Sequence, residues 1–304
     1  MSVAYSVALC THNHADRLAR TLSDLALLKA PRAPWELLII DNGSHDETPE
    51  LLARHAWQSD WQVRVVREEE LGLSSARNRA IAEARGEYVI FMDDDETADP
   101  DWLCAYEALI IAKRPDAFGG RIRVLFEDER PKWLSDELLG FLGDLDRADH
   151  MAPLTDPYES FHGGNFGFRK SVCDRVGNFD AMLGRKGTTN NTGGEDVDFY
   201  RRLLAAGLRV WWTPEAVIYH RIQAVKLKRS YFLDLHYRQG RIQGARTRGG
   251  QSRLPLGYLL PQAARAYGRA LGKRLREGSA NSLRLEMNAA YFTGYLLGWM
   301  RDPA

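Results

Sequence analysis

Apolar segments typical of strands alternate with amphipathic segments typical of helices four times within the first hundred residues. In the first helical segment, residues 15–29, four leucines recur at spacings of four, three and three, which places them on one helix face. Such alternation predicts a mostly parallel sheet with right-handed crossovers and helices on both faces, a Rossmann-like α/β fold. The strand-like segments are residues 3–10, 35–40, 62–66 and 88–92.

Three consecutive carboxylates, Asp93, Asp94 and Asp95, come directly after the fourth of these segments. Adjacent carboxylates repel one another and raise each other's pKa unless a cation or hydrogen-bond donors neutralise them. Mg²⁺ and Mn²⁺ prefer carboxylate oxygens, so a divalent metal site is one interpretation. The other interpretation is a solvated acidic turn. We expect the next residue, Glu96, to be a solvated neighbour of the three.

Polar side chains also follow two other predicted strands, since Thr11 comes after the first strand and Asp41 after the second. In open parallel sheets the ligand binds beyond the carboxyl ends of the strands. We therefore expect Thr11, Asp41 and the three adjacent aspartates to line one crevice. That convergence favours a ligand or metal site over a solvated turn.

Two later segments carry further groups suited to a site. Gly163 and Gly164 are paired glycines, which let a backbone or a ligand approach closely. Glu195 and Asp196 open a predicted helix, where acids either complement the helix dipole or serve function. The other elements expected here are a substrate-facing insertion with a short helix at residues 130–157, a loop that moves over the site at 183–194, and two short strands at 208–213 and 216–220.

The composition is ordinary for a soluble globular protein, with 44% hydrophobic and 27% charged residues in a chain of 304. Three isolated cysteines argue against a disulfide framework or a cysteine-based metal site. Neither a signal peptide nor an apolar run of roughly 20 residues is found. The isolated cysteines favour the cytoplasm, where we expect the protein to lie. The formal charge of zero is unevenly distributed, because residues from 221 onward carry sixteen Lys and Arg against four acids. This net +12 suits an anionic surface.

Five segments together resemble a known family. They read "VALCTHNHADRL", "LLIIDNGSHDET", "GLSSARNRAIAEARGEYVIFMDDDE", "GGNFGFRKSV" and "GGEDVDFYRRLLAAGLRVWWTPEAVIYHR". Their order and spacing are similar to those of the family 2 glycosyltransferases, which have the GT-A fold. The resemblance covers residues 3–221 and implies an inverting hexosyltransferase that moves a sugar from a nucleoside diphosphate donor to an acceptor hydroxyl.

The resemblance also implies roles for the acidic residues. Asp93 and Asp95 match the family's Asp-x-Asp motif, so Asp95 would coordinate Mn²⁺ or Mg²⁺. Asp93, or Asp94 beside it, would reach the donor ribose or the metal through water. His220 follows the last strand, as does the histidine that completes the metal shell in many relatives. A bound divalent ion would stabilise charge on the departing nucleoside diphosphate.

The Glu-Asp motif and the glycine segment concern the acceptor. Asp196 would be the catalytic base that removes the acceptor proton, and Glu195 would orient the acceptor or cap the helix. Gly163, Gly164 and Asn165 match a segment that lies near the donor sugar and the acceptor in relatives.

The remaining motif residues concern the nucleotide. Thr11 and Asn13 would contact the nucleoside together with Asp41. Asn42 stands where uridine-using relatives often have a second acid, and its amide can both accept and donate hydrogen bonds. We expect UDP as the nucleotide, with TDP and GDP left open. Arg77 of the "ARN" motif would either contact phosphate or pack beneath the donor site.

These expectations divide the chain into a catalytic domain, residues 1–221, and a basic helical region, residues 222–304. Within the catalytic domain, residues 1–126 would bind the nucleotide sugar and 127–221 the acceptor. The basic helices would dock on the domain, form a homodimer, or bind an anionic membrane at its inner face, while no nucleic-acid module is found. The acceptor would be a saccharide or lipid-linked saccharide in cell-surface polysaccharide or glycolipid assembly. The alternatives are a sugar nucleotidyltransferase and a non-catalytic nucleotide-sugar binding protein.

Overall fold

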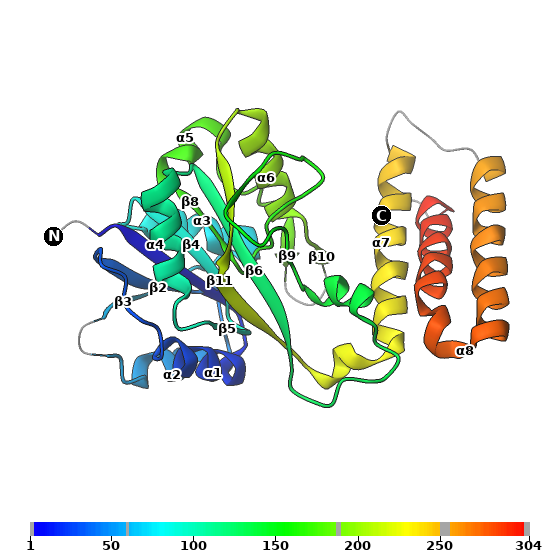
Figure 1. The fold of residues 1–304 in the computed structure, drawn as a ribbon, viewed down its shortest axis with the longest axis horizontal. Coiled ribbons are helices and arrows are strands. Elements are labelled where there is room, and N and C mark those ends of the chain that lie inside the picture. Colours follow the sequence, from blue (N-terminus) through cyan, green and yellow to red (C-terminus); the bar gives the residue numbers. More distant parts are fainter. Residues whose placement is uncertain (1–2, 59–60, 187–189, 250–255, 301–304) are drawn as a thin grey trace. The chain divides into compact units, whose positions relative to one another are not determined.

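The computed structural model describes residues 3–58, 61–186, 190–249 and 256–300. The chain forms two compact units (Figure 1). The first unit comprises Met1–Val124 and Gly143–Arg221, and the second comprises Leu125–Leu142 and Ile222–Ala304. The longer segment of the second unit, Ile222–Ala304, has the bounds expected for the basic helical region. The shorter segment, Leu125–Leu142, falls mostly in the part that the sequence assigned to the acceptor half.

A mixed sheet forms the centre of the first unit (Figure 1). Across the described residues its strand order is β3-β2-β1-β4-β8-β6-β11-β5, and β7 pairs with β11 outside this path. The half from β3 to β4 is parallel, as predicted, and β8 then runs antiparallel to both of its neighbours. The strands are β1 (Tyr5–Thr11), β2 (Trp35–Asp41), β3 (Gln62–Arg67), β4 (Tyr88–Asp93), β5 (Glu96–Ala98), β6 (Ala117–Phe126), β7 (Ala152–Leu154), β8 (Phe166–Arg169) and β11 (Val210–Ile222).

Helices cover both faces of this sheet, and alternate residues of the central strands point to opposite sides. On one side, Val7 and Leu9 of β1 belong to the apolar cluster that includes α1 and α4. On the other, Ala8 belongs to the cluster that includes α3 and α6. The helices of the first unit are α1 (Ala15–Leu25), α2 (Thr48–Arg54), α3 (Leu73–Glu83), α4 (Trp102–Lys113), α5 (Cys173–Val176) and α6 (Glu195–Ala205), with a 3₁₀ turn η2 (Lys170–Val172).

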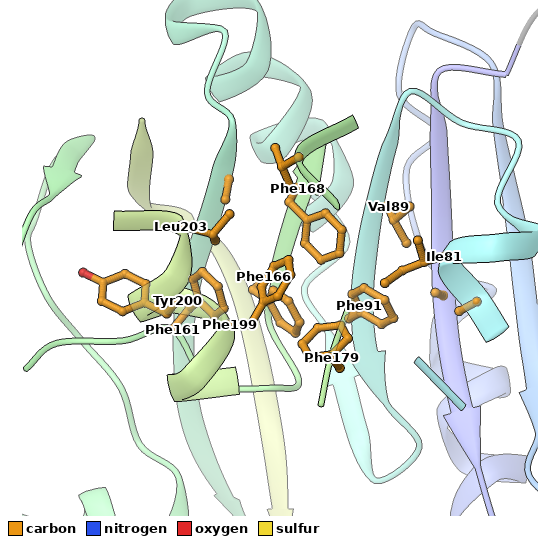
Figure 2. Packing of buried hydrophobic residues seen from close by; sticks show 14 of the residues in the cluster. Ile81, Val89, Phe91, Phe161, Phe166, Phe168, Phe179, Phe199, Tyr200 and Leu203 are labelled. Carbon is orange, nitrogen blue, oxygen red and sulfur yellow. The ribbon is translucent and has the colours of Figure 1, made fainter. Parts of the chain in front are cut away.

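An aromatic core packs α6 against the sheet (Figure 2). Phe166 of β8 stacks between Phe161 and Phe91, with ring centroids 4.6 and 5.1 Å apart. Phe199 of α6 packs on Phe179 at 4.6 Å. These contacts join segments that are far apart in sequence, and Phe91 belongs to the strand that ends at Asp93.

The prediction of two short strands at the end of the first unit was wrong. β11 is a single strand that runs through Pro214. On one edge it pairs with β7 at Val210–Trp212 and with β5 at Ile218–His220, so the proline falls between these two ladders, where no N–H is needed. β5 was not predicted, and its pairing sets His220 opposite Glu96.

The expected loop at residues 183–194 instead contains two antiparallel strands, β9 (Gly184–Lys186) and β10 (Asn190–Thr192). Residues 187–189 lie outside the described residues. The expected short helix in residues 130–157 is present as the 3₁₀ helix η1 (Asp136–Leu142), which belongs to the second unit.

The second unit consists mainly of α7 (Arg229–Gly249) and α8 (Leu256–Met300), preceded by the 3₁₀ turn η3 (Ala224–Leu227). Gly278, with φ 80°, breaks α8 into two helices, residues 256–277 and 279–300. On α7, Gly240 and Gly244 face backbone of α8, and Gly294 and Gly298 of α8 face backbone of α7. A Cβ at any of the four would overlap a carbonyl oxygen of the facing helix, so the two backbones are in direct contact.

The segment Leu125–Leu142 packs on α7 through aromatic contacts. Trp133 meets Phe232 edge-on at 5.7 Å, and Phe141 meets His236 in the same way at 4.8 Å. None of the helices in the described part of the chain is long and apolar enough to cross a membrane.

Candidate active site

The three adjacent aspartates point in different directions, beginning with Asp93 at the end of β4. Its backbone N–H donates to Oε2 of Glu96 at 3.0 Å, and its carboxylate lies 3.4 Å from Nη2 of Arg77. Withdrawal from water raises the pKa of Asp93, and the neighbouring Asp95 adds to that shift while Arg77 opposes it. The carboxylate remains about a third exposed (38%), so it is available to a ligand.

Asp94 is directed back into the protein. It is buried and accepts a hydrogen bond from Oγ1 of Thr11 at 2.6 Å. Its Oδ2 also lies 3.0 Å from Nδ1 of His14, and this hydrogen bond raises the pKa of His14. Thr11 and Asp94 were both expected to contact the donor, but here their side chains satisfy one another. Together with His14 they hold the loop that follows β1.

Asp95 and His220, which the family resemblance assigned to a metal site, lie close together. Oδ2 of Asp95 is 3.7 Å from Nε2 of His220 and 3.6 Å from Nη1 of Arg17. This approach depends on the antiparallel pairing of β5 with β11, which spans more than a hundred residues of sequence. Among the described residues, no group of three or more His, Cys, Asp or Glu side chains is arranged to hold a metal ion. A metal at Asp95 would therefore need further ligands from substrate or water.

Glu96 was expected to be solvated, and this expectation was wrong. The residue is only 4% exposed. Burial, followed by repulsion from Asp93 and Asp95, raises its pKa well above the usual range. The carboxyl group occupies space beside Gly164, where any Cβ would overlap its oxygens. In the sequence Glu96 follows three acids, a pattern typical of a solvated acidic run. No local sequence feature indicates that its side chain is buried.

Arg77 is buried beneath the carboxylates and is 1% exposed. Its Nη1 donates to Oε1 of Glu195 at 2.9 Å, and its Nη2 donates to the carbonyl oxygen of Gly163 at 2.9 Å. The guanidinium also lies 5.6–5.8 Å from the ring centroids of three phenylalanines, Phe91, Phe166 and Phe179, which Figure 2 shows grouped together. Two roles were considered for Arg77, phosphate contact and packing beneath the donor site, and this geometry agrees with packing.

The Glu-Asp pair divides into a buried and an accessible residue at the start of α6. Glu195 is buried; Oε1 accepts from Arg77, and Oε2 has no hydrogen-bond partner among the described residues. It therefore neither caps the helix nor reaches outward to an acceptor. Asp196 is partly exposed, and its Oδ1 accepts the N–H of Val197 at 2.8 Å.

His162 lies in the same region and was missed by the sequence reasoning. Burial lowers its pKa, while the carboxylate of Asp196 acts in the opposite direction. A neutral imidazole near Asp196 can donate or accept a proton or a hydrogen bond. The one sequence signal was its position directly before the paired glycines, Gly163 and Gly164.

Asn165 is structural rather than an acceptor contact, which corrects the expectation for this residue. It is fully buried, and its Nδ2 donates to the carbonyl oxygens of Arg121 and Ala216. Its Oδ1 accepts from the Trp102 indole at 2.8 Å and from the Tyr106 hydroxyl at 2.5 Å. Both the donors and the acceptor of this amide thus have all of their hydrogen-bond partners within the protein.

The side chains expected to bind the nucleoside also have partners within the protein. Asn13, with φ 52°, accepts the N–H of His45 through Oδ1 at 2.7 Å. Asp41 accepts the N–H of Ser44 at 3.0 Å and lies 3.1 Å from Nη1 of Arg67.

Asn42 is engaged even more completely. Its Nδ2 donates to the carbonyl oxygens of Glu68 and Glu70, and its Oδ1 accepts the N–H of Gly72 at 2.9 Å. A direct base contact from this amide, as the sequence suggested, would require one of these hydrogen bonds to break. Asn13, Asp41 and Asn42 therefore shape the loops at the carboxyl ends of β1 and β2.

Comparison with known proteins gives relatives along most of the chain. The profile of the family described as "Glycosyl transferase family 2" matches residues 6–177. The succinoglycan biosynthesis protein ExoM of Rhizobium meliloti is 25% identical over 243 residues, which cover 78% of this chain and 73% of that protein. The glucosyl-dolichyl phosphate glucuronosyltransferase of Haloferax volcanii is 26% identical over 223 residues, covering 71% and 69%.

Solved structures show the same fold. The mannosyltransferase PcManGT from Pyrobaculum calidifontis, in complex with GDP-Man and Mn²⁺, superposes with a TM-score of 0.62 at 17% identity, covering 99% of this chain and 88% of that one. TarS residues 1–349 from S. aureus, in complex with UDP-GlcNAc, gives 0.57 at 16% identity, covering 97% and 91%. The chain belongs to glycosyl transferase family 2 and has the GT-A fold.

Proposed function

We propose that this glycosyltransferase moves a sugar from a nucleoside diphosphate donor to an acceptor hydroxyl with inversion at the anomeric carbon. The observation that carries the proposal is that one buried residue, Arg77, contacts the carboxylates of both Asp93 and Glu195. Arg77 contacts Asp93, which is two residues from Asp95, and also Glu195, which is adjacent to Asp196. The donor side and the acceptor side of the site are thereby held to the same guanidinium.

A divalent cation suits the donor side. Burial raises the pKa values of Asp93 and Glu96, and repulsion from the neighbouring carboxylates adds to both shifts; a cation would relieve that repulsion. Asp95 and His220 offer one oxygen and one nitrogen within 3.7 Å of each other, a donor set compatible with Mn²⁺ or Mg²⁺. When bound, the ion would neutralise charge on the leaving diphosphate. Two fold neighbours are described as complexes with Mn²⁺.

On the acceptor side, Asp196 would take the proton of the attacking hydroxyl. It is the accessible member of the Glu-Asp pair, and the hydrogen bond from Val197 fixes its orientation. Glu195 would position α6 through Arg77 without touching substrate. His162 would assist the proton transfer, because its neutral imidazole near the carboxylate of Asp196 can donate or accept a hydrogen bond.

The nucleotide is proposed as UDP, with GDP and TDP as the alternatives. Fold neighbours are described with UDP-GlcNAc, UDP and GDP-Man, so the fold accommodates either base. Since the amide of Asn42 is used within the protein, base selection would fall to backbone groups of the loops after β1 and β2.

The acceptor is proposed to be a saccharide or lipid-linked saccharide in the assembly of a cell-surface polysaccharide or glycolipid. One relative is named for succinoglycan biosynthesis, and another is a glucosyl-dolichyl phosphate glucuronosyltransferase. Such acceptors would place the enzyme at the cytoplasmic face of a membrane. Family membership disfavours the nucleotidyltransferase alternative.

The test is a panel of nucleotide sugars assayed for Mn²⁺-dependent binding and for slow donor hydrolysis. Asp95→Ala should abolish metal-dependent donor binding. Asp196→Ala should retain binding and lose transfer to any acceptor found. Asp198→Asn is the matched control for Asp196, because it lies on the same helix and pairs with Arg202 at the surface. Normal transfer by Asp196→Ala would exclude it as the base, and absence of metal-dependent binding in the unmodified protein would exclude the metal.

A further inference from the structure

The first half of α8, residues 256–277, exposes an apolar row to solvent. The row consists of Leu260, Tyr267, Leu271 and Leu275, which are spaced seven, four and four residues apart and therefore lie on one side of the helix. Their exposed fractions are 54%, 53%, 59% and 77%. The side that packs into the second unit is a different row, Leu259, Ala263 and Ala270. The exposed leucines are thus not the helix's core-facing residues.

A second exposed row on the same helix is basic. Arg265, Arg269 and Arg276 are all exposed, and at 100° per residue they lie on a third side of the helix. Within the described part of the chain, no carboxylate lies within ion-pair distance of these three arginines. The helix holds five basic residues and one acid, Glu277, which lies 3.7 Å from Lys273.

The basic row also borders a hollow of about 70 Å³ between the two halves of α8. Arg265 and Arg269 line it from the first half, and Asn288 and Phe292 line it from the second. This leaves room for an oxyanion beside two guanidinium groups that have no acidic partner.

We propose that the exposed part of residues 256–277, with the apolar row along one edge and the basic row along the other, binds the surface of an anionic lipid bilayer. The apolar row would enter the boundary between headgroups and acyl chains, and the basic row would contact lipid phosphates. A second copy of the chain fits less well, because it would not supply acids to the basic row: each helix has one acid, Glu277, and that acid already pairs with Lys273. The inference deepens the proposed membrane localisation, but it does not depend on sugar transfer.

The experiment is flotation of the full-length protein with vesicles of phosphatidylcholine alone or with added phosphatidylglycerol, at low and high salt and without nucleotide sugar. We expect binding to the anionic vesicles only, weakened by salt. The triple variant Arg265→Gln/Arg269→Gln/Arg276→Gln should lower the partition coefficient by about fivefold per arginine. Salt-insensitive binding, or equal binding to both vesicle types, would overturn the proposal.

A second variant tests the apolar row. Leu260→Gln/Leu271→Gln/Leu275→Gln should lower the partition coefficient at least about tenfold while leaving the melting temperature unchanged, because the side chains are exposed. The control is Leu27→Gln/Ile111→Gln, which removes two apolar residues of similar exposure from the first unit and should bind normally. Unchanged vesicle binding by the leucine variant would refute the proposal. So would a lipid-free dimer, seen by sedimentation velocity, that the leucine variant abolishes.

Discussion

Replacing Arg77 with methionine would leave the carboxylate of Glu195 buried without its cationic partner. Oε2 of Glu195 already has no hydrogen-bond partner among the described residues, and Oε1 accepts from Arg77. Removing one member of a buried ion pair costs roughly 3–5 kcal/mol, because the remaining charge stays desolvated. Methionine keeps the aliphatic bulk against the three phenylalanine rings, so little of this loss would come from a cavity. For a unit of this size the expected fall in melting temperature is roughly 10 °C.

The assay is urea unfolding of a double-mutant cycle formed by Arg77→Met, Glu195→Gln and the double variant. Because the double variant no longer buries a negative charge, it should be more stable than Arg77→Met alone. Arg79→Met is the matched control: Arg79 lies on the same helix but is 41% exposed and pairs with Glu83 at the surface. Its loss should cost no more than about 0.5 kcal/mol.

Two results would refute this reasoning. The first is an Arg77→Met protein as stable as Arg79→Met, since the buried guanidinium would then add nothing to the free energy of unfolding. The second is a double variant no more stable than Arg77→Met, which would mean that the cost does not come from the unpaired carboxylate of Glu195.

Three further predictions concern packing and pH. Gly164→Ala should destabilise the first unit by roughly 1–3 kcal/mol in thermal melts, because its methyl group would overlap the buried carboxyl of Glu96. Gly244→Ala should destabilise the second unit by at least as much, because the new methyl group would overlap a carbonyl oxygen of α8. Gly268→Ala is its control: this glycine faces open space, so the substitution should stabilise its helix by up to about 1 kcal/mol. Burial lowers the pKa of His236, so the unfolded chain binds the proton more readily; stability should fall as the pH drops below 6.5, and His236→Gln should reduce that slope in urea titrations.

Each of these predictions has a control. Gly193→Ala adds a methyl group in open space and should leave the melting temperature of the first unit nearly unchanged. His150→Gln replaces an exposed histidine and should keep the pH slope of the unmodified protein. Equal melting temperatures for Gly164→Ala and Gly193→Ala would contradict the close packing at Gly164, and an unchanged melting temperature for Gly244→Ala would contradict the helix contact. A pH dependence of stability that is unchanged in His236→Gln would contradict the burial of His236.

Local sequence patterns were sufficient for the first four strands of the fold and the helices between them. The strands β1 to β4 and the helices between them follow from apolar periodicity and from the polar residues that end each segment. The same reasoning placed Thr11, Asp41 and Asp93 at one edge of the sheet, because the carboxyl ends of parallel strands meet there. The approach of Asp95 to His220 was also predicted, but only from the family resemblance.

The tertiary structure decided which polar side chains face solvent and which are buried with hydrogen-bond partners inside the protein. Glu96 and Asp93 stand in one acidic run, yet the first is buried and the second is partly exposed. Asn165 and Arg77 belong to motifs that suggested substrate contacts, but both are saturated or enclosed by the core. These outcomes depend on contacts between segments tens of residues apart or more, such as β5 with β11 and α3 with α6. Periodicity within one segment contains no information about such pairings, because the burial of a side chain is set by whichever distant element packs over it.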